Sequence, residues 1–357
     1  MTSDKFGFQF DPFCHLDSTK DARLHEYLVI PKTVEIAWGD APVAIFAQPG
    51  GGKSALRSYT EKVFRGTRGV KLPITYVPAT YSPDPEFHFR ALRQSLAGSI
   101  FIYLISYPDL FLQFSSQRQA QTLQLLTYLP YRLDTTLDII ANTQSIEEIE
   151  QFLGVRAISG IEKPGRAHQE LVRILRNSQT RKTKDADIAT LLTQAQEIFE
   201  IKSFHILVDG LDGFIETTDE TALFTWIAPL LDRAESWSQE QIYLKFFLPT
   251  LLSAFPENLT GIQTATLKWD DGLLAEVIRR RLYVASGGAF DSLDAIATPE
   301  LRNVEFHLAR QLPAEQKLPR KIILKARHLL ERADHNTDGY IHYNDVFTKE
   351  ANYAGQA

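Results

Sequence analysis

Short apolar runs along the first three quarters of the chain predict the strands of a sheet. The segment 42–48 (PVAIFAQ) is apolar and bounded by Pro and Gly, which is the pattern of a strand buried on both faces. Four further strand candidates lie at 72–79, 204–208, 242–248 and 264–269. Helical patterns such as 221–234 separate the strands. Because alternating strands and helices are typical of βαβ units, we expect an α/β fold with a mainly parallel sheet.

Helical periodicity dominates two other regions. The stretch between the second and third strands is longer than a crossover needs, so we expect a mostly helical insertion over about 105–186. Beyond residue 269, helical spacing recurs at 273–282, 299–312 and 320–333. These patterns divide the chain into an N-terminal segment (1–40), an α/β core (41–269) and a C-terminal helical lid subdomain (270–357).

The composition of the 357 residues is that of a globular protein, with 44% hydrophobic and 23% charged residues. Cys14 is the only cysteine, which excludes a disulfide within one chain and fits a reducing cytoplasm. The N-terminus lacks the pattern of a signal peptide, and the most apolar stretch, 100–105, is too short to cross a bilayer. We therefore expect a cytoplasmic protein without membrane insertion. The net charge of -6 argues against an extensive nucleic-acid-binding surface but leaves a local basic patch open.

A glycine-rich loop connects the first strand to a helix predicted over 53–64. Residues 47–54 (AQPGGGKS) match the phosphate-binding loop pattern, except that Ala47 stands where the first glycine is usual. Consecutive glycines let backbone N–H groups converge on phosphate oxygens, and the start of the helix carries a partial positive charge. We expect Lys53 to pair with the β- and γ-phosphates and the Ser54 hydroxyl to ligate Mg²⁺. The predicted nucleotide contacts are Gly50, Gly51, Gly52, Lys53, Ser54 and Ala55.

The third strand delivers a carboxylate to the edge of the sheet where ligands bind in open α/β folds. In the segment 204–212 (FHILVDGLD), Asp209 follows the apolar run and is predicted to hold Mg²⁺ directly or through water. Asp212 is a candidate general base for the attacking water, with Glu216 as the second candidate; an ordinary turn residue is an equal alternative for Asp212. The sequence lacks a guanine-reading Asn-Lys-x-Asp motif, which favours ATP by default.

The glycine loop and the separate DGLD strand resemble those of the STAND class of signalling ATPases, which are relatives of the AAA+ and origin-recognition ATPases. The resemblance implies a P-loop NTPase three-layer sandwich and an Mg²⁺-dependent ATPase that serves as a nucleotide switch in bacterial signalling or defence. Asp209 and Asp212 fit the second motif, but Gly213 stands where a further acid is frequent. This departure implies that the protein binds nucleotide better than it hydrolyses it.

The resemblance extends to both flanks of the loop. The segment 11–31 is similar to segments that enclose the adenine base, and residues 28–30 are the candidate apolar wall; ordinary core packing is the alternative. The segment 318–323 (LPRKII) resembles the start of a lid helix whose arginine senses the γ-phosphate. Arg320 is therefore a catalytic candidate, although an exposed arginine in a first helical turn is the commoner explanation.

Two further features are candidates, Thr250 from the resemblance and the arginine triplet 279–281 from its concentrated positive charge. Thr250 follows the fourth strand, where related ATPases place a polar residue that contacts the γ-phosphate. The triplet 279–281 (RRR) offers an arginine finger across a subunit boundary, and a solvated helix face is the favoured alternative.

Two other segments resemble ligand-binding patterns, but each also has an ordinary structural explanation. Residues 334–345 (DHNTDGYIHYND) follow the calcium-binding EF-hand loop, but Asp345 replaces the bidentate Glu at the last position. We favour a polar turn and assign no calcium. The basic stretch 163–184 would suit a phosphate backbone, but it lacks interleaved aromatic residues, and a solvated helix and loop explains it as well.

The leading hypothesis is a STAND-like regulatory ATPase whose nucleotide state moves the C-terminal helices and controls self-association or a separately encoded effector. The alternative is a DNA-acting AAA+ ATPase of the origin-recognition or transposition-regulator type, which predicts hydrolysis that is stimulated by DNA and sensitive to salt. A third hypothesis is an interaction module that binds ATP and scarcely hydrolyses it.

Overall fold

A computed structural model describes residues 6–82, 84–130, 133, 135, 137, 138, 166–177, 186–255 and 259–347. The chain divides into two compact units. Unit 1 comprises Met1–Val34, Ala47–Leu56 and Leu267–Ala357, and unit 2 comprises Glu35–Phe46 and Arg57–Thr266. The segment Ala47–Leu56, which contains the glycine loop, thus belongs to the same unit as the C-terminal helices.

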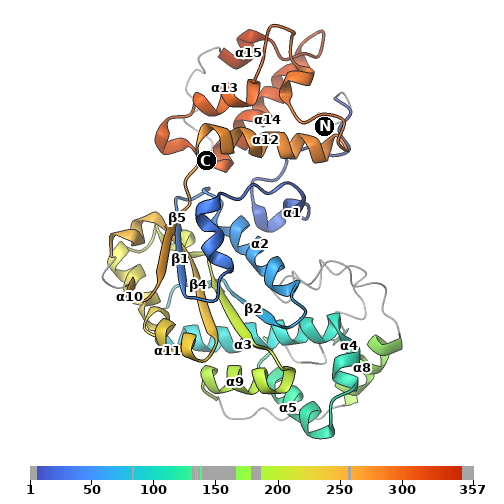
Figure 1. Cartoon of the computed structure of the whole chain (residues 1–357), viewed down its shortest axis with the longest axis vertical. Helices are drawn as coiled ribbons and strands as arrows, with labels where there is room; N and C mark the ends of the chain where they lie inside the picture. The colour runs from blue at the N-terminus through green and yellow to red at the C-terminus, as the bar shows by residue number, and fades with distance from the viewer. Residues whose placement is uncertain are drawn as a thin grey trace. The chain divides into compact units, whose positions relative to one another are not determined.

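Unit 2 is built around a five-stranded parallel sheet in the order β2-β3-β4-β1-β5 (Figure 1). The strands are β1 Val43–Ala47, β2 Lys71–Tyr76, β3 Ser203–Val208, β4 Ile242–Pro249 and β5 Gln263–Thr266. β1 to β4 are buried almost throughout, as expected for parallel strands that are covered on both faces. The predicted α/β class with a parallel sheet is confirmed, and each of the five predicted strands overlaps one in the structure.

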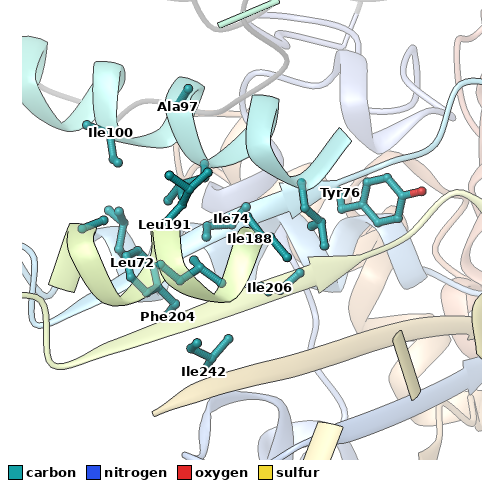
Figure 2. Packing of buried hydrophobic residues seen from close by; sticks show 14 of the residues in the cluster. Leu72, Ile74, Tyr76, Ala97, Ile100, Ile188, Leu191, Phe204, Ile206 and Ile242 are labelled. Carbon is teal, nitrogen blue, oxygen red and sulfur yellow. The ribbon is translucent and has the colours of Figure 1, made fainter. Parts of the chain in front are cut away.

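Helices cover both faces of this sheet. On one face, α3 (Pro85–Ser106) and α9 (Ile188–Phe199) lay apolar side chains over β2 and β3, as Figure 2 shows for Ala97 and Leu191. On the other face, Phe64 of α2 (Lys53–Arg65) stacks on His205 of β3 with ring centroids 3.9 Å apart. Since side chains alternate along a strand, His205 points away from the face that holds Phe204 and Ile206.

The long segment between β2 and β3 is helical over most of the part that the structure describes. α3 begins at Pro85, where the Asp84 carboxylate accepts a hydrogen bond from the Glu86 backbone N–H, and it runs deep into the main core. The helices that follow are α4 Pro108–Leu112, α5 Ser116–Leu126 and α8 Arg166–Asn177. Much of the basic stretch 163–184 lies outside the described residues. Between β3 and β4 lie α10 Glu220–Leu231 and α11 Ala234–Gln239.

Unit 1 contains the C-terminal helices together with the N-terminal segment. Its helices are α1 Leu24–Tyr27, α12 Asp271–Ala285, α13 Val304–Arg310, α14 Pro319–His335 and α15 Tyr343–Phe347. The three helices predicted beyond residue 269 are present, although the middle one starts at Val304 rather than 299. Phe8 and Phe13 share a buried core with α12, α13 and α14, and the Gln9 N–H donates to the Ala285 carbonyl at 2.8 Å. Residues 6–34 of the N-terminal segment are therefore an integral part of this unit.

None of the helices within the described residues is both long and apolar enough to cross a membrane.

Candidate functional site

The backbone of the glycine loop requires glycine at three consecutive positions. Gly50 and Gly52 have φ angles of +78° and +97°, a region that other residues rarely adopt. A Cβ atom on Gly51 would lie 2.8 Å from the Gln48 carbonyl oxygen and 3.0 Å from the Ala47 Cβ. The Gly51 N–H donates to the same Gln48 carbonyl at 2.9 Å, which closes a tight turn. The sequence motif is thus matched by a backbone shape that needs its glycines.

Lys53 and Ser54 open α2 directly after this turn. The Lys53 residue is only 3% exposed, and its Nζ donates to the Ala47 carbonyl at 2.7 Å and to the Gln48 carbonyl at 3.1 Å. The first N–H groups of a helix have no acceptor within the helix and carry partial positive charge. A buried ammonium group and a helix N-terminus are therefore combined in one short segment, which suits an anionic ligand.

Arg320 lies against the loop within unit 1. Its backbone N–H donates to the Gly50 carbonyl at 3.4 Å, and an added Cβ on Gly50 would lie 3.2 Å from the Arg320 Cβ and 3.6 Å from its Nε. Pro319, at the start of α14, pre-sets the first helical turn that presents Arg320. The predicted sensor and the predicted loop are therefore brought together.

Trp269 also contacts the loop, and sequence reasoning missed it. Its indole Nε1 donates to the Gly51 carbonyl at 2.9 Å, and its ring lies 3.5 Å from the position of a Cβ on Gly52. Leu267 and Pro319 line the same side of Gly52. The signal in the sequence is an aromatic donor at the end of the last predicted strand, but the local pattern there indicates only a strand.

Asp209 stands directly after β3 in unit 2, as predicted. Its side chain is only 4% exposed, and its Oδ2 accepts a hydrogen bond from Arg57 Nε at 3.1 Å. Gly210 follows with φ +94°, and a Cβ there would meet Val77 Cγ1 at 2.7 Å, so the position after the carboxylate requires glycine. No cluster of three or more His, Cys, Asp or Glu suited to a metal ion occurs among the described residues. Mg²⁺ that arrives with a nucleotide takes only one or two carboxylates, so Asp209 as its ligand stays a prediction.

A buried network of charges extends from Asp209 along α2. Arg57 Nη1 donates to Glu61 Oε2 at 3.1 Å, and Glu61 Oε1 accepts from Arg65 Nη2 at 2.9 Å. The hydroxyl of Thr75, on β2, donates to Glu61 Oε2 at 2.8 Å. Two arginines face two carboxylates, so the buried charges balance. Sequence reasoning missed this network, although the spacing of four residues between the α2 members places them on one helix face.

The other predicted acids and the polar residue after β4 are also in unit 2. Asp212 is half-buried in the 3₁₀ turn Leu211–Phe214, and Glu216 is exposed beyond it. Thr250 is half-buried at the start of the 3₁₀ turn Thr250–Ala254, which follows β4. Asp212 and Thr250 each lie in a turn that follows the carboxyl end of a strand, and their roles stay predictions.

Two of the three residues of the predicted apolar wall 28–30 lie in separate clusters of unit 1, and the third, Ile30, is half-buried. Val29 is buried with the α12–α14 core, which agrees with ordinary core packing. Leu28 packs against the cluster formed by Leu24, Tyr27 and Ala55, so one of the three candidates belongs to a cluster that includes a residue of the first turn of α2.

The arginine triplet is engaged within unit 1. Arg281 Nη1 donates to the Pro12 carbonyl at 2.8 Å, and Arg281 pairs with the buried Asp21 at 3.5 Å. Arg280 pairs with Glu276 at 2.7 Å and donates to the Leu28 carbonyl. Two of the three arginines therefore hold the N-terminal segment on α12.

The EF-hand-like segment forms a turn closed by its own polar groups. Asn336 Nδ2 donates to the Tyr340 carbonyl at 2.7 Å and to Asp345 Oδ2 at 2.8 Å, and Asp338 Oδ1 contacts His342 at 3.0 Å. These contacts agree with the interpretation as a polar turn.

Comparison with known proteins identified no matching family model, no curated protein and no solved structure.

Proposed function

We propose that this protein binds ATP with Mg²⁺ at the glycine loop and acts as a nucleotide-dependent switch of the STAND-like type. The observation that carries the proposal is the contact of Arg320 and Trp269 with the loop glycines Gly50 and Gly51. Residues that follow the last strand and open α14 thus touch the backbone expected to bind phosphate. A phosphate group at this loop would change contacts that the C-terminal helices make directly.

The loop itself supports an anionic ligand of this kind. Gly50 and Gly52 adopt positive φ angles that favour glycine, which supports the proposal. Lys53 supplies a buried positive charge, and its Nζ donates to backbone carbonyls of the same loop. The Ser54 hydroxyl and the Asp209 carboxylate are the proposed oxygen ligands of Mg²⁺. Asp212 is the proposed general base, and a missing second acid at Gly213 makes slow hydrolysis the expected behaviour.

A switch requires that a ligand interact differently with two conformations. Arg320 offers such an interaction, because an exposed guanidinium beside the loop gains a strong partner when a γ-phosphate is present. The proposal is that ATP draws Arg320 toward the γ-phosphate and ADP does not. The resulting difference would control self-association or the binding of a separately encoded effector.

The test compares Arg320→Ala with Lys321→Ala, its exposed neighbour on α14. Affinities for ATP and ADP are measured by calorimetry, and particle mass is recorded with each nucleotide. We expect Arg320→Ala to weaken ATP binding about tenfold and to leave ADP binding within about twofold, since a charge-assisted hydrogen bond is worth about 1.5–3 kcal/mol. Equal losses for both nucleotides, or none for either, would contradict the role of Arg320. DNA-stimulated hydrolysis with steep salt dependence would instead favour the DNA-acting alternative.

A further inference from the structure

The Arg57–Asp209 pair is the most informative feature that the proposed nucleotide site does not explain. Arg57 is 7% exposed and Asp209 is 4% exposed at the side chain, and Arg57 Nε lies 3.1 Å from Asp209 Oδ2. A buried carboxylate without a counter-ion is strongly unfavourable. In this structure, the counter-ion of Asp209 is the guanidinium group of Arg57, which belongs to α2.

Arg57 is held in place from the other side. Its Nη1 donates to Glu61, which is bound in turn by Arg65 and by Thr75. All of these side chains are buried, so Arg57 has little freedom to leave the carboxylates it contacts. The guanidinium is planar and carries five donors, so it can serve Asp209 and Glu61 at the same time.

A positive charge at this position opposes a divalent cation on the same carboxylate. The Coulomb repulsion between a guanidinium and Mg²⁺ that share one carboxylate is large at the effective dielectric of a protein interior. We propose that Arg57 is the counter-ion of Asp209 in the nucleotide-free state and sets the Mg²⁺ concentration that nucleotide binding requires. The inference rests on the proposed function, because it places nucleotide-bound Mg²⁺ at Asp209.

Arg65 provides a matched control. It carries the same charge on the same helix and contacts the same Glu61, whereas Arg57 bridges Glu61 and Asp209. Arg57→Met and Arg65→Met each remove one positive charge and keep an unbranched apolar stem. If Arg57 acts through Asp209, only the first substitution changes the Mg²⁺ requirement.

The experiment titrates Mg²⁺ into protein and a fluorescent ATP analogue, and it records nucleotide binding in EDTA as the reference. We expect Arg57→Met to lower the half-saturating Mg²⁺ concentration about tenfold and Arg65→Met to leave it within about twofold of the wild type. In the double variant Arg57→Met/Asp209→Asn, the decrease in the half-saturating Mg²⁺ concentration should disappear. An unchanged or higher Mg²⁺ requirement in Arg57→Met, or an equal change in Arg65→Met, would overturn the inference.

A second substitution covers the case in which Arg57→Met does not fold. Arg57→Gln removes the positive charge but keeps an amide that can donate hydrogen bonds to the carboxylates. We expect its half-saturating Mg²⁺ concentration to fall in the same direction as in Arg57→Met, and an unchanged value would count against the inference.

Binding of nucleotide in EDTA separates the two proposals. Wild-type protein that binds no nucleotide in either condition would refute the proposed function, and with it the inference. Binding in EDTA with the same Mg²⁺ requirement in all variants would refute the inference alone.

Discussion

The indole Nε1 of Trp269 donates a 2.9 Å hydrogen bond to the carbonyl of Gly51, the central glycine of the candidate phosphate-binding loop. The segment after β5 thereby fixes the loop at a glycine where an added side chain would clash with the loop's own backbone. This bond and the contact of Arg320 with Gly50 tie the loop to the C-terminal part of unit 1.

Trp269→Phe tests whether this bond shapes the loop. The substitution keeps an aromatic ring and removes the N–H donor, so we expect a loss of about 1 kcal/mol in the free energy of unfolding of unit 1. ATP affinity should fall severalfold because the loop is no longer held. Urea unfolding and a calorimetric ATP titration measure the two effects. Trp38→Phe is the control, because the Trp38 Nε1 has no hydrogen-bond partner among the described residues; a comparable loss of ATP affinity there would contradict the explanation.

Gly51→Ala tests the steric requirement of the loop. The new Cβ would lie 2.8 Å from the Gln48 oxygen, so the turn must open. We expect the free energy of unfolding to fall by about 2 kcal/mol, which is within the usual range for overpacking. ATP affinity should fall more than tenfold. Gly213→Ala is the control, because no described atom lies within 4 Å of a Cβ at that position. Equal ATP affinity in both variants would show that the loop does not need glycine for binding.

Glu61→Gln tests the buried charge network. Glu61 is completely buried and bonded to Arg57, Arg65 and Thr75, so loss of its charge leaves two guanidinium groups facing one carboxylate. We expect the free energy of unfolding to fall by about 3 kcal/mol, as for other broken buried ion pairs. Chemical denaturation measures the change against Glu235→Gln, an exposed glutamate on α11. A difference below about 1 kcal/mol, the level of a surface pair, would mean that the network contributes little.

His205 should make the protein sensitive to acid. Burial, with the nearby cations Lys245 and Lys71, lowers the pKa of His205 to about 2, from an ordinary value of 6.5. Asp40, at 3.5 Å, would favour the charged ring, but it is exposed and burial prevails. Because the folded pKa lies below the unfolded one, the unfolded state takes up the proton first. Stability contributed by neutral His205 is present above pH 6.5 and is lost as the pH falls below it, by about 1.4 kcal/mol per pH unit.

The measurement compares urea unfolding at about pH 7.5 and about pH 5.5 in the wild type and in His205→Phe, which keeps a ring stacked on Phe64. We expect the free energy of unfolding to change less between the two pH values in the variant than in the wild type, by about 1 kcal/mol. His15→Gln, at an exposed histidine, should behave as the wild type. The same pH dependence in His205→Phe as in the wild type would refute the assignment.

Local patterns in the sequence are sufficient to predict the strands of the sheet and to place the carboxyl ends of β1 and β3, whereas the predicted ends of the second and fifth strands, 79 and 269, lie beyond those of β2 and β5. Apolar runs of strand length predict β1 to β4. Because the glycine loop follows β1 and Asp209 follows β3, predicting these two strands also locates both features. The Arg57–Asp209 contact joins residues that are 152 positions apart, and no local pattern encodes it. The same holds for Trp269 and Gly51, which are 218 positions apart.

Asp84 and Pro85 are local signals for the start of α3, but the buried body of this helix and the division of the chain into units lie beyond local patterns. The apolar residues of α3 pack on both the sheet and α9, so the pattern that marks a single buried helix face is blurred. The N-terminal segment joins the C-terminal helices through contacts such as Arg281 with Pro12, again between distant positions. Tertiary contacts of this kind appear only when the whole chain is folded.

The central claim, nucleotide binding at the glycine loop, is tested most directly by calorimetric titration of Mg²⁺-ATP into the wild type, Lys53→Ala and Lys62→Ala. Lys62 is an exposed lysine on the same helix, so it controls for charge and helix stability. We predict that the wild type and Lys62→Ala bind ATP with the same affinity and that Lys53→Ala loses binding by at least about a hundredfold, since the phosphates would lose their buried ammonium partner. Unchanged ATP binding in Lys53→Ala would contradict the claim.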